Sequence, residues 1–237
     1  MFPCTPASSS TPKVNSGAIA GTATNDSATF GNIGQFYQTL VAVGSPVALS
    51  NNTAANVCNV ALPNGDWDVE ANCNFTATGC TITASSASIS QTSATHPTDG
   101  SEVPQGLVYT TTAFLSGVTL PRKRASLTST VHTGLTAVAA TDVITDVANG
   151  YANGQPVYFT ALTGGAGLAV NTIYYVINVA TDSYKLSATS GGAAIDITTT
   201  MTAGTLYAAT LVYMVAKATF SAGSISGYGQ INARRVR

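Results

Sequence analysis

Short segments rich in Val, Thr, Tyr and Ile recur along this chain, and turn-forming residues separate them. A 3.6-residue apolar period, the mark of an amphipathic helix, is hard to find. Residues 67–71 (WDVEA) instead alternate apolar and acidic side chains, as on a half-buried strand. The segments that read as strands in the first half are 38–49, 57–62, 67–75, 80–91, 106–115 and 125–130. The sequence therefore predicts an all-β protein with a jelly-roll-like antiparallel sandwich.

Composition divides the chain into three parts. Residues 1–32 are rich in Ser, Thr, Ala, Pro and Gly and have too few apolar residues to offset their ordering entropy, so they are interpreted as an extended N-terminal arm. Residues 131–208 contain strand-like segments with Gly-containing turns and are expected to form a second, small β-barrel or sandwich module. The sequence resumes a strand after this module, which predicts insertion into a hairpin of a body made of 33–130 and 209–237.

Charge is scarce in this chain. Only 8% of the residues are charged and the net charge is −1, whereas an ordinary soluble domain is about 25% charged. Near-neutral chains repel one another weakly and associate readily. No apolar run approaches the roughly 18 to 20 residues of a membrane span, and residues 1–6 lack the features of a secretory signal. We therefore expect a structural or assembly protein, folded in a cytoplasm, with no membrane partner.

The cysteines are expected to be thiols and not disulfides, because a cytoplasm is reducing. If residues 74–79 formed a hairpin tip, Cys73 and Cys80 could face each other across it and pair. The simpler interpretation is that both are small apolar residues on strands. There is no CxxC motif and the chain has only two His, so no zinc site and no cofactor is expected.

Three acidic residues, Asp66, Asp68 and Glu70, alternate along one predicted strand and lie about 6 to 7 Å apart on one face. The favoured interpretation is a solvated acidic face or one side of an interface salt link. Calcium binding with help from loop carbonyls and a glycosidase carboxylate pair remain alternatives. Trp67, between them in sequence, is expected in the core. No Gly-x-Ser-x-Gly elbow or phosphate loop occurs, so no catalytic residue and no enzyme activity is predicted.

Two basic clusters hold six of the nine Lys and Arg residues. The favoured interpretation of these clusters is contact with a partner protein, and a solvated surface is the second. Nucleic-acid binding is the least favoured, because neither interleaved aromatic residues nor a binding motif supports it. Phe2, Pro3 and Cys4 at the start of the arm are the candidate anchor. The remaining candidate partner-binding residues are Arg122, Lys123, Arg124, Arg234, Arg235 and Arg237.

The module resembles a small all-β repeat that is common in virion proteins of tailed bacteriophages. It carries G-Q-P-V-Y-F-T at 154–160, T-I-Y-Y-V-I-N at 172–178 and G-G-A-A-I-D-I-T at 191–198. The body is similar to phage surface and fibre proteins through L-P-N-G-D-W-D-V, Y-M-V-A-K-A-T-F and Y-G-Q-I-N-A-R-R-V-R, at 62–69, 213–220 and 228–237.

This resemblance implies a virion structural protein, either a capsid decoration protein or a head fibre. Such proteins are often trimeric, so a homotrimer is expected, attached through its arm to the major capsid protein or another virion protein. A tail-fibre or collar component is the alternative, with a host-surface glycan as a further candidate partner. A polysaccharide-degrading spike is less favoured, because the sequence has no long parallel β-helix repeat.

Overall fold

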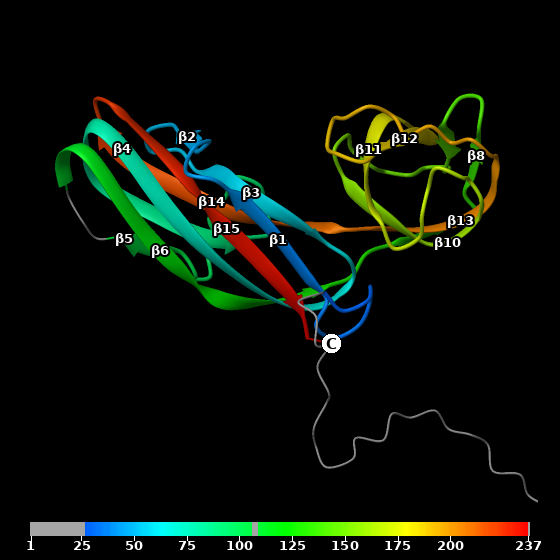
Figure 1. Cartoon of the computed structure of the whole chain (residues 1–237), viewed down its shortest axis with the longest axis horizontal. Helices are drawn as coiled ribbons and strands as arrows, with labels where there is room; N and C mark the ends of the chain where they lie inside the picture. Colours follow the sequence, from blue (N-terminus) through cyan, green and yellow to red (C-terminus); the bar gives the residue numbers. More distant parts are fainter. Residues whose placement is uncertain (1–26, 106–108, 237) are drawn as a thin grey trace, which may run out of the picture.

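The computed structural model describes residues 27–105 and 109–236. These residues form fifteen strands in two sheets and contain no helix, so the all-β prediction is confirmed. One sheet builds a larger body and the other a smaller module, and the two stand apart like the arms of a V (Figure 1). The described residues contain no helix long and apolar enough to cross a membrane.

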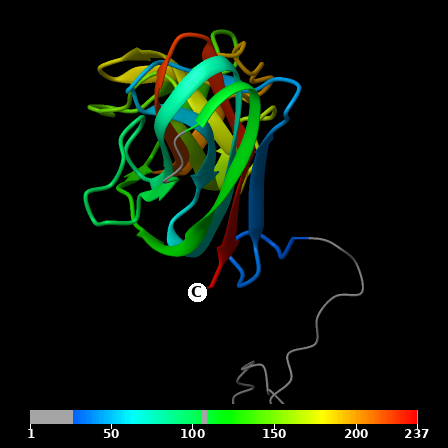
Figure 2. The same ribbon diagram turned by 90° about the vertical axis from the view of Figure 1, so that its left-hand side faces the viewer.

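The body is an eight-stranded sheet with the order β1-β15-β4-β14-β3. Beyond this path, β2 pairs with β15, and β5 and β6 pair with β4, all antiparallel. Figure 2 faces the body and shows β6, β4, β15 and β1 side by side. The strands are β1 (Phe36–Val41), β2 (Val47–Leu49), β3 (Ala55–Leu62), β4 (Gly65–Ser90), β5 (Val103–Gln105), β6 (Tyr109–Leu127), β14 (Thr210–Ser221) and β15 (Ser224–Arg235).

Strand β4 organises the body because it is 26 residues long and changes partners along its length. Its first part pairs with β6 and β15, and its last part, from Thr81 to Ser90, pairs with β14. The strand thereby carries one layer of the sandwich into the other. Trp67 and Phe75 on its inward face are fully buried in the shared core, which confirms the placement of Trp67.

The possible hairpin at residues 74–79 does not form, because these residues lie within β4. Gly79 adopts a positive φ of 61°, and the strand continues through it. Cys73 and Cys80 therefore sit seven residues apart on one strand and not opposite each other. Both are buried and free, and so is Cys58. Burial raises the pKa of the Cys58 and Cys73 thiols to about 12, which makes them unreactive core residues.

The second sheet comprises every strand between residues 131 and 208. Its order is β10-β11-β12-β9-β8-β13, and β10 also pairs with β13, so six strands close into a barrel with β7 added outside β13. A separate core fills it, with Phe159 and Leu206 fully buried. The strands are β7 (Val131–Thr133), β8 (Thr136–Val138), β9 (Val143–Thr145), β10 (Pro156–Gly164), β11 (Ile173–Ala180), β12 (Ser183–Ser187) and β13 (Met201–Ala208).

The strands that flank this module differ from the expected hairpin. β6 and β14 do not pair with each other, because each pairs with a different part of β4. The end of β6 nevertheless lies near the start of β14. Leu127 lies opposite Gly65, Thr210 lies opposite Leu62, and only two residues separate Leu62 from Gly65. The module thus leaves and re-enters the body beside one tight turn.

Hydrogen bonds join the body to the module near this turn. The Ala209 backbone N–H donates to the Pro156 carbonyl at 2.8 Å. The Asn64 backbone N–H donates to the Tyr158 hydroxyl at 3.2 Å. The Tyr158 ring also lies 5.3 Å from the ring of Phe30, which precedes β1. Of the predicted arm, residues 27–32 are described, and residues 30–34 form a turn that leads toward β1. Residues 1–26 lie outside the described part.

Candidate interaction surface

The acidic and basic residues singled out by the sequence meet on one face of the body. Asp68 on β4 lies opposite Arg124 on β6 and opposite Arg234 on β15. Arg234 in turn lies opposite Phe36 on β1. Register across four strands therefore assembles what the sequence presents as separate clusters. We call this surface the charged face: Asp66, Asp68, Glu70, Arg122, Arg124 and Arg234.

Two ion pairs link β6 to β4 within the charged face. Arg122 Nη1 lies 3.4 Å from Asp68 Oδ2, and Arg124 Nη2 lies 3.2 Å from Asp66 Oδ2. The arginine side chains are largely exposed, so each pair contributes at most about 1 kcal/mol to stability. They hold charges of both signs at fixed positions on this surface.

The calcium and glycosidase alternatives gain no support from this arrangement. Asp66 and Asp68 each face a guanidinium, which opposes the binding of a cation between them. Over the described ranges, no group of three or more His, Cys, Asp or Glu residues is placed to hold a metal ion. The sequence favours a solvated acidic face or one side of an interface salt link, and the structure instead pairs Asp66 and Asp68 with arginines of the same chain.

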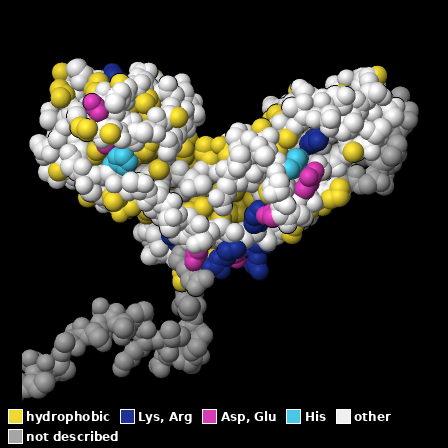
Figure 3. All heavy atoms as spheres, turned by 180° about the vertical axis from the view of Figure 1, so that it is seen from behind, with side chains coloured by type: hydrophobic (Ala, Val, Ile, Leu, Met, Phe, Trp, Pro, Cys, Tyr) yellow, Lys and Arg dark blue, Asp and Glu magenta, His cyan; other side chains and the backbone are white. Residues whose placement is uncertain are grey.

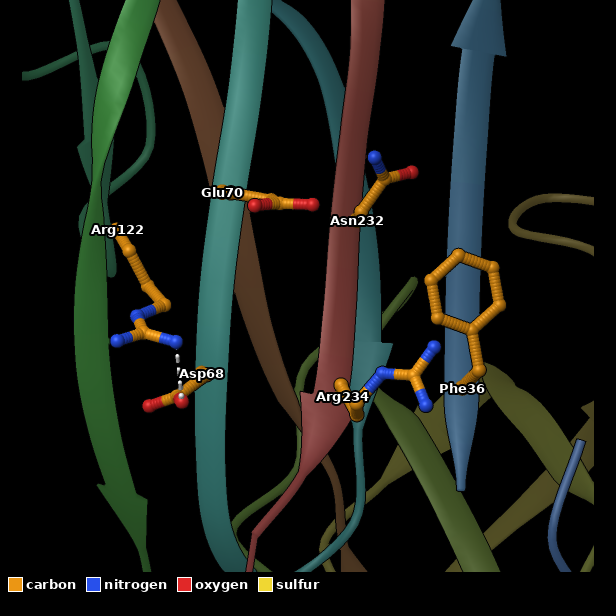
Figure 4. Close-up of a pocket in the computed structure, with 6 residues that line it drawn as sticks. All are labelled: Phe36, Asp68, Glu70, Arg122, Asn232 and Arg234. Carbon is orange, nitrogen blue, oxygen red and sulfur yellow. Dashed lines mark ion pairs between the residues drawn. The ribbon is translucent and has the colours of Figure 1, made fainter. Parts of the chain in front are cut away.

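A shallow cleft of about 140 Å³ crosses the charged face. In it, Glu70 is exposed and has no ion-pair partner among the described residues. Arg234 is also exposed and makes no ion pair within that set, and its guanidinium lies 5.7 Å from the centre of the Phe36 ring. Figure 4 shows Glu70 extended toward Asn232 and Arg234 turned toward Phe36. Two opposite charges thus remain unpaired on one surface.

Arg235 does not belong to this surface. It is buried, its guanidinium carbon lies 4.5 Å from the centre of the Trp67 ring, and its Nε donates to Gln35 Oε1 at 3.1 Å. Burial lowers its pKa from the ordinary value. Gly65 has a φ of 136°, and a Cβ there would overlap the Arg235 guanidinium. The expectation that Arg235 contacts a partner therefore does not fit its position, because alternation along β15 turns it inward.

Lys123 also does not belong to the charged face. Its Nζ lies 2.8 Å from Asp99 Oδ2 in the segment after β4 and 3.3 Å from Ser101 Oγ. The hydrogen bond from Lys123 holds the pKa of Asp99 below its usual range. Of the predicted partner-binding residues, Arg122, Arg124 and Arg234 remain exposed. Phe2, Pro3, Cys4 and Arg237 lie outside the described residues.

A Ser-His-Glu array that sequence motifs did not reveal lies at the far end of β4. Ser88 Oγ is 2.8 Å from His96 Nδ1, and His96 Nε2 is 3.9 Å from Glu102 Oε1. Ser88 is fully buried, so no substrate carbonyl can reach its hydroxyl. Burial lowers the pKa of His96. The array braces the loop after β4 and does not form a nucleophilic site.

A second polar cluster closes one end of the barrel. His132 Nδ1 is 2.9 Å from Asp146 Oδ1, and the Tyr184 hydroxyl donates to Asp146 Oδ2 at 3.3 Å. The Tyr151 ring lies 5.0 Å from the His132 ring. Asp146 and Tyr184 are buried and satisfy each other, whereas the buried Tyr151 hydroxyl has no hydrogen-bond partner among the described residues. The cluster also escaped sequence reasoning, because its members are far apart along the chain.

No family model, no curated protein and no solved structure matches the chain. Figure 3 shows that most of the charged side chains visible on this face of the body gather at its lower end. The C-terminus lies at the same end (Figure 1).

Proposed function

We propose that this chain is a bacteriophage virion structural protein, a homotrimer that decorates or projects from the capsid. In this account the N-terminal arm and the charged face attach it to the shell. The resemblance of the module and body sequences to phage virion proteins is the first support. The second is the scarcity of charge, which suits a protein that functions packed against copies of itself and a partner.

The proposed attachment site rests on one observation: the arm joins the body beside the charged face. The Phe36 backbone N–H donates to Ser27 Oγ at 2.8 Å, which fixes the first described residue of the arm against β1. Phe36 itself lies opposite Arg234. An arm bound to the shell would therefore bring the charged face to the same surface.

The charges on that face suit recognition of a protein surface. Fixed charges of both signs set the orientation and rate of association more than its strength. The module has its own closed barrel and core, and it extends away from the attachment end (Figure 1). We assign it the outward position on the particle.

Binding to virions that lack this protein tests the proposal. We expect deletion of residues 1–26 to abolish binding. The double variant Arg122→Gln/Arg124→Gln should weaken it about tenfold, because two peripheral ion pairs contribute up to about 1 kcal/mol each. Lys185→Gln, a neutralised cation in the module, is the matched control and should bind like the wild type. Binding at full occupancy without residues 1–26 would contradict attachment through the arm.

A tail-fibre or collar component of the same build is the second candidate, and the same end-on attachment supports it equally. Copy number separates a decoration protein from the fibre and collar alternatives. Quantitative mass spectrometry of purified virions should give copies comparable in number to the capsid subunits for a decoration protein. A head fibre, tail fibre or collar protein would be present in far fewer copies, and imaging would then locate it.

A further inference from the structure

Exposed apolar side chains are concentrated at the start of the body. Phe36 and Leu40 lie on the outward face of β1, and Ile33 and Val43 flank the strand. The exposed fractions are 69% for Ile33, 37% for Phe36, 64% for Leu40 and 60% for Val43. We call these four residues the β1 stripe. The polar Gln38 lies between Phe36 and Leu40 on the same face. Exposed apolar side chains clustered among polar residues in this way mark an interaction site.

The residues of the β1 stripe do not pack against the body core. The alternate residues of β1, Tyr37 and Val41, are the ones that pack against the body core. Phe36 and Leu40 therefore point outward by strand alternation, and no register shift interrupts the pairing of β1 with β15. A stable body does not need these side chains to be apolar, so their exposure calls for a partner.

Charges beside the β1 stripe identify the kind of partner. Glu70 and Arg234 lie on the same outer face, on β4 and β15, and neither has an ion-pair partner among the described residues. In Figure 4 the Glu70 carboxylate extends toward Asn232 and the Arg234 guanidinium toward Phe36. A uniformly charged partner would satisfy only one of them. A second copy of this chain offers both signs, and its net charge of −1 adds little repulsion.

We infer that the β1 stripe and the unpaired Glu70 and Arg234 form the contact between copies of this chain. The inference rests on the proposed homotrimer and assigns its interface. Phe36 and Leu40 pack against the neighbouring copy, and Glu70 of one copy meets Arg234 of another. Arg122 and Arg124, on the opposite side of the charged face, remain available to the shell.

Mass in solution tests the interface. Light scattering after size exclusion should give the wild type three times the chain mass of 23.9 kDa. Leu40→Glu should give a folded monomer at the same micromolar concentration, because it places a charge in the contact. Val147→Glu is the matched control: Val147 is 75% exposed, but it lies in the module, so this variant should stay trimeric.

A charge exchange gives a second test that does not depend on the apolar residues. Glu70→Arg and Arg234→Glu should each lower the association constant at least tenfold. The double variant Glu70→Arg/Arg234→Glu should recover most of that loss. Additive losses in the double variant would overturn the Glu70–Arg234 contact.

The outcomes separate this inference from the proposal on which it rests. A trimeric wild type and a trimeric Leu40→Glu variant would overturn the interface and leave the trimer standing. A monomeric wild type would overturn both. A dimeric wild type that Leu40→Glu dissociates would support the β1 stripe as the self-contact and contradict three-fold assembly.

Discussion

The guanidinium of Arg235 lies over the indole of Trp67, with its carbon 4.5 Å from the centre of the ring, in the interior of the body. The charge is stabilised by the ring face and by Gln35 Oε1. This stack joins the end of β15 to the start of β4. It thereby fixes the end of the body at which the arm and the charged face meet.

We expect Arg235→Ala to lower the free energy of unfolding by about 2 to 4 kcal/mol, because it removes the stack, a buried hydrogen bond and packing. Arg122→Ala, at an exposed ion pair on the same side of the protein, should cost at most about 1 kcal/mol. Denaturant unfolding at one protein concentration measures both. Equal losses for the two variants would contradict the structural role of Arg235.

His96 should make stability depend on pH. Burial, with Lys217 nearby, holds its pKa below the ordinary value of 6.5, and Glu102 opposes this only partly. Between the folded and unfolded pKa values the unfolded chain binds more protons, so the free energy of unfolding rises with pH. The contribution is complete above 6.5 and is lost as the pH falls toward the folded-state pKa.

The variant His96→Gln isolates this effect, because it removes the titrating group. The wild type should lose more stability than the variant as the pH falls from about 7.5 to about 5. The slope with pH is the readout, so a uniform loss of stability in the variant does not affect the result. Parallel slopes would show that His96 is not held neutral.

The module should be separable from the body. Each has its own core, and the ends of β6 and β14 are brought together by the turn between Leu62 and Gly65. Replacing residues 131–208 with about six Gly and Ser residues, which span up to roughly 20 Å, should leave a folded body. Its near-ultraviolet circular dichroism should retain the signal of buried Trp67. A body that unfolds would contradict independent cores.

The buried thiols should be inert in the native protein. In a Cys4→Ser variant, Cys58, Cys73 and Cys80 should not react with an aromatic disulfide reagent at pH 8 and should all react after unfolding. The high pKa of Cys58 and Cys73, about 12 for each, and the burial of all three give the reason. Rapid labelling of the native variant would mean that the core opens readily.

The sequence predicted the all-β class well, because strand patterns and turn residues are local. The strands of the second sheet begin at Val131 and end at Ala208, limits that the change in composition also suggested. The prediction of two separate strands, 67–75 and 80–91, was wrong. Gly79 gives a local turn signal, but it lies within one long strand. Whether a glycine with positive φ ends a strand depends on neighbouring strands, which local sequence does not encode.

The candidate surface was only partly predictable for the same reason. Strand alternation requires Arg234 and Arg235 to face opposite sides, but only the folded body reveals that Arg235 is the inward one. The ion pairs of Asp66 and Asp68 depend on the register between β4 and β6, across more than fifty residues of sequence. The outward face of β1 carries Phe36, Gln38 and Leu40, and this mixed pattern by itself does not predict which face of the strand is exposed.

A reconstruction of the intact virion at a resolution that resolves strands tests the central claim most directly. The account predicts three copies of the chain around a three-fold axis on the outside of the particle. In each copy the side of the charged face that holds Arg122 and Arg124 should approach the shell, residues 1–26 should contact a virion protein, and the module should point outward. Absence of the chain from purified particles, or a module docked on the shell with the charged face turned to solvent, would contradict it.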